Sequence, residues 1–197
     1  MTHSDIDELI RYFSKLPGLG PRSARRVVLH LIRQKQGLME PLASVMMRAL
    51  TSIRTCSVCG NLDSHDPCAI CSDTRRDPSS ICVVEELADL WAIERCNLYK
   101  GQYHVLSGTL SAIDDRGPAQ LNIESLIARA SKDVVTEIIL ATNATIEGQT
   151  TAHYLTTRLE GCHVSISRLA QGIPMGGELD YLDDGTLGAA LKARLPF

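Results

Sequence analysis

The sequence is poor in the features that would place a protein in a membrane or outside the cell. Its 197 residues contain no apolar run that approaches the ~20 residues of a membrane-spanning helix. The amino-terminal stretch MTHSDIDELIRYF lacks the basic-then-apolar pattern of a secretory signal. Aromatic residues make up only 4% of the chain, so a core must be built from Leu, Ile, Val and Ala. These absences predict a soluble, cytoplasmic protein.

Charge is distributed unevenly, although the formal net charge is only −3. Residues 1–55 carry nine Lys and Arg against four Asp and Glu, whereas residues 56–197 carry eleven against nineteen. A basic head can bind phosphate, and an acidic body suits a protein partner or a cation. The alternative is that both are ordinary solvated faces.

The first 55 residues predict three helices. Apolar residues recur at helical spacing from Ser4 to Phe13, from Arg22 to Gly37 and from Pro41 to Ile53. Pro17 and Gly18 stop the first helix, and we expect Gly37 to end the second. The three apolar stripes predict one shared helical core.

After residue 78 the pattern alternates between short apolar strands and helices. The predicted strands cover residues 81–84, 103–106, 137–141 and 164–168, and the predicted helices cover residues 86–95, 123–130 and 148–159. Strands that alternate with helices predict an α/β domain, with a mostly parallel sheet covered by helices.

Four of the seven cysteines form two closely spaced pairs, Cys56-x2-Cys59 and Cys68-x2-Cys71. Each pair can present two thiolates to one ion, and two pairs complete a tetrahedron with no open position, which is typical of a structural zinc site. The surrounding segment is poor in apolar residues and needs such a source of stability. Disulfides are the alternative, which the odd cysteine count and the missing secretory signal disfavour. His65, inside the loop, could substitute as a ligand.

The remaining cysteines are scattered. Cys82 lies on a predicted strand, and Cys96 and Cys162 lie apart from any other cysteine. We expect all three to be small core residues.

A glycine-rich turn, Leu16–Ala24, joins the first two predicted helices. Gly18 and Gly20 free backbone amides for close approach to an anion, at the start of a helix whose dipole favours negative charge. The bases Arg22, Arg25 and Arg26 follow at once. This arrangement predicts a helix-hairpin-helix that grips DNA phosphates without reading bases. The alternative is a tight turn whose glycines only permit the geometry.

Motifs along nearly the whole chain resemble one family of bacterial recombination mediators, the RecR family. They are the turn LPGLGPRSA at residues 16–24, the four cysteines, ICVVE at 81–85, ATNATIEG at 141–148 and RLAQGIPMGGEL at 168–179. The resemblance implies a helix-hairpin-helix head (residues 1–55), a four-cysteine zinc finger (56–78), a Toprim domain (79–168) and a C-terminal region with a Walker-B-like strand and a helix (169–197).

The resemblance also implies a function. Such proteins bind or clamp DNA as homodimers or homotetramers and, with RecO and RecF, help to load the RecA recombinase at single-stranded gaps, associated with the nucleoid during repair. By position, the DNA-contacting bases of the family fall on Arg22 and Arg26. One structural zinc ion per chain is implied at the four cysteines.

Toprim enzymes hold magnesium with a Glu after one strand and an Asp-x-Asp pair after a later one. Here Glu85 occupies the first position, but the later strand is followed by Thr142-Asn143-Ala144-Thr145, and Glu147 is the nearest acid. We therefore expect a non-catalytic scaffold in which Glu85 and Glu147 contact a basic partner, RecO by resemblance, or a stray cation. The alternative is a magnesium-dependent nuclease or topoisomerase-like enzyme with a reduced site.

Nucleotide hydrolysis is not expected. The segment Gly172–Leu179 has Walker-B-like character, but the glycine-rich turn at residues 16–24 follows no strand and lacks the Gly-Lys-Ser/Thr of a Walker A loop. A Walker B acid without that loop has no phosphate cradle.

Overall fold

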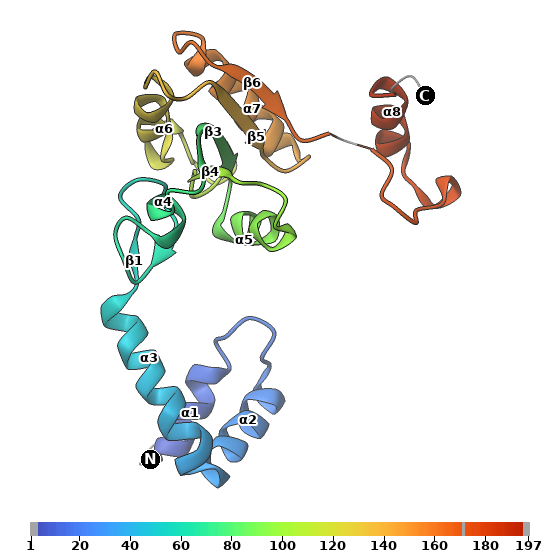
Figure 1. Ribbon diagram of the computed structural model, residues 1–197. Coiled ribbons are helices and arrows are strands. Elements are labelled where there is room, and N and C mark those ends of the chain that lie inside the picture. Colours follow the sequence, from blue (N-terminus) through green and yellow to red (C-terminus); the bar gives the residue numbers. More distant parts are fainter. Residues whose placement is uncertain (1–3, 171, 195–197) are drawn as a thin grey trace. The chain divides into compact units, whose positions relative to one another are not determined.

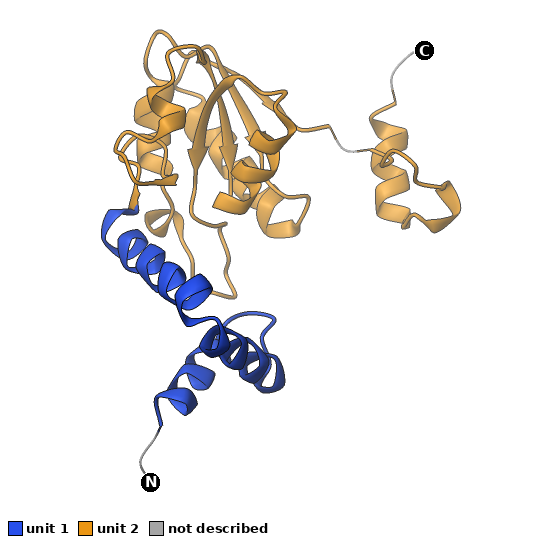
Figure 2. Cartoon of the chain, turned by 60° about the horizontal axis from the view of Figure 1, so that its bottom comes forward, with its two compact units in different colours: residues 1–53 blue, residues 54–197 orange. Residues whose placement is uncertain are grey.

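The computed structural model describes residues 4–170 and 172–194. The chain divides into two compact units, residues 1–53 and residues 54–197 (Figure 2). None of the helices in the described ranges is long and apolar enough to cross a bilayer.

The first unit is helical, as predicted. Ser4 caps its first helix by accepting a hydrogen bond from the Asp7 amide. Its elements, labelled in Figure 1, are α1 (Asp5–Phe13), α2 (Pro21–Arg33), a π-helical turn (Lys35–Met39) and α3 (Glu40–Ser52). The prediction that α2 runs to Gly37 is wrong. Gln34, at φ −117° and ψ 48°, leaves the helical region and ends α2 at Arg33, so Gly37 lies inside the π-helical turn.

The prediction of one core shared by three helices is also wrong. The buried residues of this unit, Ala24, Val28 and Leu31, all come from α2, which packs against α1. Helix α3 buries none of its residues, and its Leu50 is 78% exposed. The apolar stripe of α3 is real, but none of the described residues 4–53 covers it.

The second unit begins with a small module that holds the four paired cysteines. Its short strands β1 (Arg54–Thr55) and β2 (Leu62–Asp63) pair antiparallel, and the one-turn helix α4 (Ala69–Ser72) follows. These elements are too short to leave a periodic pattern, and the sequence did not predict them.

A four-stranded parallel sheet forms the body of this unit (Figure 1). The strand order is β4-β3-β5-β6, so β3 and β5 are central and β4 and β6 form the edges. All four strands and three helices fall where the sequence predicted them. They are β3 (Asp77–Val84), α5 (Leu87–Cys96), β4 (Gly101–Val105), α6 (Ile123–Ala130), β5 (Glu137–Ala141), α7 (Ile146–Leu159) and β6 (Ser165–Arg168).

Alternating residues of the central strands serve two cores, one on each face of the sheet. Ile81 and Val83 of β3 face α6 and α7, where Leu126 and Leu155 are fully buried. Cys82 and Val84 face the other way and pack with Leu90 of α5. The result is the expected α/β architecture of three layers, which agrees with a Toprim-type fold.

The C-terminal part contains a 3-10 turn (Leu179–Tyr181) and the helix α8 (Asp184–Lys192). The expected helix is therefore present. The Walker-B-like strand is not, because the described residues 172–194 contain no strand. Pro174, Gly176 and Gly177 explain this, since proline cannot donate to a ladder and glycine weakens extended structure.

Candidate zinc centre, DNA-binding hairpin and Toprim site

The four paired cysteines converge on one point. The Sγ atoms of Cys56, Cys59, Cys68 and Cys71 all lie within 4.8 Å of one another. The Cys59–Cys68 pair is separated by 3.6 Å and the Cys56–Cys71 pair by 4.0 Å. A tetrahedral zinc ion with bonds of about 2.3 Å holds its sulfurs about 3.8 Å apart. The cysteines therefore fit a structural zinc site, and all seven cysteines of the chain are free thiols.

Local backbone geometry supports this cluster. The amide of Cys68 donates to Sγ of Cys56, and the amide of Asn61 donates to Sγ of Cys59. Gly60 turns the chain at φ +79°, and a Cβ there would lie 3.0 Å from the carbonyl oxygen of Val105. A hydrogen bond from the Cys71 thiol is the largest cause that lowers the pKa of Cys59 to about 5. Thiolate character at this position favours a metal.

The other sulfur and imidazole candidates lie outside the cluster. His65 is exposed and lies beside Asp63 instead of the cysteines. Cys82 is buried in the core, as predicted, and burial raises its pKa to about 12. Cys162 packs against the α6–α7 core. Cys96 is a correction, because it is exposed at the end of α5, where its thiol donates to the Ala92 carbonyl.

The glycine-rich turn joins α1 to α2 as an exposed hairpin. Gly18 has φ +78°, a conformation that favours glycine. Gly20 is the N-cap of α2 and Pro21 follows at the helix start, with no side chain capping the first turn. The first-turn amides of a helix have no intrahelical partner, so this end of α2 offers donors and a positive dipole to an anion.

Arginines line the helix that follows this hairpin. Arg22, Arg25 and Arg26 are all exposed on α2. Arg22 and Arg26 lie one turn apart and therefore share a face. His30 lies one further turn along and Arg33 three residues beyond it; both are exposed and line a groove with Arg26. Sequence reasoning missed these two, although an i, i+4, i+8 count from Arg22 would have found His30.

The Toprim position lies where the strand order reverses. From β3 the chain moves to β4 on one side and then to β5 on the other, and ligands of such sheets bind at the carboxyl ends of the strands at this point. Glu85 follows β3 and Asn143 lies just beyond β5. Oε1 of Glu85 accepts a hydrogen bond from the Asn143 amide (2.8 Å), and its Oε2 accepts one from Nδ2 of Asn143 (2.5 Å).

This arrangement makes Glu85 less accessible than the sequence suggested. Glu85 is only 6% exposed, and the Asn143 bonds occupy both of its oxygens, so it is not an exposed contact for a partner. Gly148 of α7 lies directly against the pair. A Cβ at position 148 would lie 2.6 Å from Oε1 of Glu85 and 2.3 Å from the Asn143 carbonyl oxygen. Glu147 is more accessible than Glu85 and lies in the first turn of α7.

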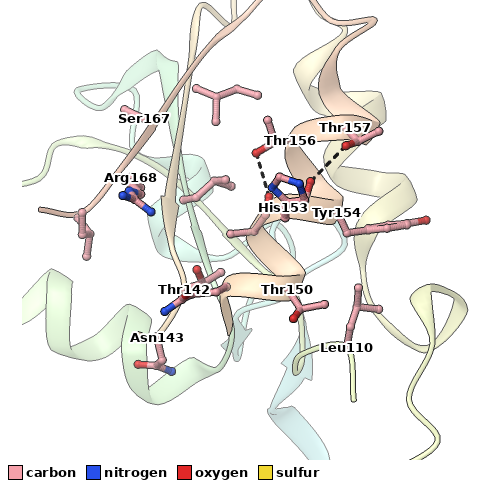
Figure 3. Close-up of a pocket in the computed structure, with 15 residues that line it drawn as sticks. Leu110, Thr142, Asn143, Thr150, His153, Tyr154, Thr156, Thr157, Ser167 and Arg168 are labelled. Carbon is pink, nitrogen blue, oxygen red and sulfur yellow. Dashed lines mark hydrogen bonds between the residues drawn. The ribbon is translucent and has the colours of Figure 1, made fainter. Parts of the chain in front are cut away.

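A groove lies beside this position, between α7 and the ends of β5 and β6 (Figure 3). Thr142 and Asn143, just beyond the end of β5, border it together with Ser167 and Arg168 of β6, and His153 lies on α7. The residues that line it include no Asp or Glu. It therefore lacks the carboxylate oxygens that magnesium prefers.

Comparison with known proteins gives one result along the whole chain. Family models match residues 6–50 ("RecR, helix-hairpin-helix"), 53–73 (the four-cysteine zinc finger domain of RecR), 79–170 ("Toprim domain") and 172–194 ("RecR, C-terminal"). The protein named "Recombination protein RecR" of Parvibaculum lavamentivorans is 58% identical over 197 residues, covering 100% of this chain and 99% of its own length. The one of Paramagnetospirillum magneticum is 59% identical, covering 100% of both chains.

The chain belongs to the RecR family. The resemblance inferred from the motifs is thus confirmed, and so is a structural zinc site at the four-cysteine module. The RecR helix-hairpin-helix region and the relatives' names support a role in recombination and repair and are consistent with DNA binding.

Proposed function

We propose that this chain is a non-catalytic accessory protein of recombinational DNA repair. It binds or clamps DNA and, with RecO and RecF, helps to load RecA at single-stranded gaps. The observation that carries the proposal is the pair of hydrogen bonds from Asn143 to Glu85, which place an amide donor where a Toprim enzyme needs a second carboxylate. A magnesium-dependent nuclease or topoisomerase is the alternative, and it would require several carboxylates free to bind metal.

A denaturing gel separates these two functions. Labelled gapped DNA is incubated with the zinc-loaded protein and magnesium. Intact strands at every time point are the result expected of a scaffold. Nicks that disappear when Glu85 is replaced by Ala, in a variant that still folds, would establish the enzyme and refute the proposal.

The hairpin supports DNA contact through phosphates. It combines the uncapped start of α2 with the exposed bases Arg22, Arg25 and Arg26, a donor set that recognises backbone and not bases. Gly18 and Gly20 add no side chain that would obstruct the approach of an anion. We expect the double variant Arg22→Ala/Arg26→Ala to reduce the salt slope of duplex DNA binding by about 1.8, at 0.9 per phosphate contact. An unchanged slope would remove the hairpin from the DNA interface.

Glu147 is the acid left for a partner. Its position in the first turn of α7 makes it part of the acidic body of the chain. We propose that it contacts RecO, so Glu147→Ala should weaken a pull-down between the two purified proteins while zinc content stays unchanged. Glu160→Ala, at the other end of α7, is the matched control.

Self-association is supported by the uncovered stripe of α3. Val45, Met46, Leu50 and Ile53 are each more than half exposed. Contiguous exposed apolar surface of this kind marks interaction sites, and we propose that a second copy of the chain covers it in a homodimer or homotetramer. Leu50→Glu should lower the mass measured by light scattering, and an unchanged mass would move the interface elsewhere.

A further inference from the structure

The zinc module covers one edge of the parallel sheet. Strand β4 is an edge strand, and an uncovered edge leaves backbone groups free to pair with other chains. The amide of Val105 instead donates to the carbonyl oxygen of Cys59 at 2.8 Å. Ile70, beside the ligand Cys71, packs against both the cysteine cluster and the core under α5. The metal site and the sheet are therefore joined directly.

Arg129 of α6 reaches the same edge. Its Nη1 donates to the carbonyl oxygen of Tyr103 at 2.7 Å and lies 3.1 Å from Nδ1 of His104. Tyr103 and Val105 are alternate residues of β4, so their outer backbone groups point to the same side. The guanidinium and the Cys59 loop thus contact neighbouring positions along one strand.

The charge of Arg129 has no carboxylate partner. Among the described residues, no Asp or Glu oxygen lies within 4.0 Å of its guanidinium. Both hydrogen-bond partners are neutral: one is a carbonyl, and the other is His104, whose pKa burial lowers to about 4. Arg129 is itself partly buried, and a buried charge is unfavourable unless an opposite charge compensates it.

The cysteine cluster supplies that opposite charge. Four thiolates around one Zn²⁺ carry a net charge of about −2, by the thiolate ligation of structural zinc. Burial lowers the pKa of Arg129, and the negative charges of Cys71, Cys59 and Cys56 act in the opposite direction. Arg129 contacts Tyr103 of β4, and Cys59 contacts Val105, two residues further along the same strand. A cation without a carboxylate within 4.0 Å and an anionic centre are therefore held at neighbouring positions of one strand.

We propose that Arg129 is the counter-cation of the zinc centre. It is a positioning residue of α6 whose positive charge offsets the excess negative charge of the zinc-bound thiolates, and it thereby couples zinc affinity to the Toprim sheet. The two motifs recognised in the sequence, the four-cysteine module and the Toprim domain, then form one electrostatic unit.

Two variants separate charge from hydrogen bonding. Arg129→Gln removes the charge but keeps an amide that can donate to Tyr103, whereas Arg129→Lys keeps the charge and loses the planar fork. Arg158→Gln is the control, because Arg158 pairs with Glu124 on the surface. Zinc affinity of the full chain is measured by competition with a chelator of known affinity, and the sulfur-to-cobalt absorption of the Co²⁺-loaded protein reports whether the four-thiolate geometry persists.

We expect R129Q to lose zinc affinity by about 10-fold or more, the loss typical of residues that support metal ligands. R129K should stay within about threefold, and the Arg158 control should match the wild type. Wild-type affinity in R129Q would overturn the proposal. Equal losses in R129Q and R129K would overturn it too, since the role would then depend on shape and not on charge.

A second measurement keeps the test decisive. Cys71→His reduces the net charge of the loaded site by one, so the effect of R129Q should shrink in that background, and an undiminished effect would contradict charge compensation. If R129Q does not fold with zinc bound, the zinc affinity of R129K alone decides the test. Wild-type zinc affinity in R129K then supports the proposal, and a 10-fold loss overturns it.

Discussion

Replacing Glu85 by Ala should destabilise the protein instead of removing a catalytic activity. The carboxylate accepts two hydrogen bonds from Asn143, at 2.8 and 2.5 Å. Bonds to a charged acceptor contribute about 1.5–3 kcal/mol each. Asn143 is exposed, so water can satisfy part of what its donors lose, and we expect a decrease in the free energy of unfolding of about 2–4 kcal/mol. At about 2–4 °C per kcal/mol, Tm should fall by roughly 5–15 °C.

The assay is urea and thermal unfolding of the zinc-loaded protein, followed by circular dichroism. Glu85→Gln keeps one carbonyl acceptor and should lose about half as much as Glu85→Ala. Glu147→Ala is the matched control. It removes only a favourable charge at the start of α7, for a loss of about 0.3–1 kcal/mol. A Glu85→Ala variant within about 0.5 kcal/mol of the wild type would refute a structural role for this carboxylate, whatever the nicking gel shows.

Three further results are expected of the same unit. Burial lowers the pKa of His104 to about 4, so protons bind the unfolded state more readily than the folded state. The free energy of unfolding should therefore fall by up to about 3 kcal/mol as the pH drops from 6.5 to 4. In urea titrations repeated over this pH range, a His104→Gln variant should not show that decrease. Leu126→Ala should cost about 2–5 kcal/mol in urea unfolding, whereas Leu98→Ala, which is 88% exposed in the wild type, should change stability by less than about 0.5 kcal/mol. Removing zinc with a chelator should release Cys59 from Val105, expose the edge of β4 and increase light scattering through aggregation.

The parts of the fold with a long periodic pattern were predictable from the sequence. In β3, Ile81 and Val83 face one core while Cys82 and Val84 face the other, so the strand is a continuous apolar run. Helix α3 was predicted at the right place but given the wrong environment. A stripe of apolar residues predicts that a helix face is covered. It does not indicate whether the covering surface comes from the same chain or from a second copy.

The candidate sites also differ in how much of them the sequence could predict. The four-cysteine cluster was predictable because two C-x2-C pairs encode nearly the whole ligand geometry in local spacing. Glu85 was located correctly, but its burial was not predicted. Its burial depends on Asn143, which lies 58 residues further along the chain and meets it only because β3 and β5 are neighbours.

Arg129 had no sequence signal at all, and the reason is physical. It lies on an amphipathic helix whose pattern allows a surface arginine, and its acceptors are a backbone carbonyl and a histidine on β4. Neither acceptor identifies a counter-charge. The need for a counter-charge becomes visible only when the sheet order puts β4 at the edge and the Cys59 loop against Val105. Two closely spaced cysteine pairs are enough to predict the ligands of one ion from the sequence. Compensation of a net charge depends on which residues the folded unit brings together, so it is visible only in the three-dimensional structure.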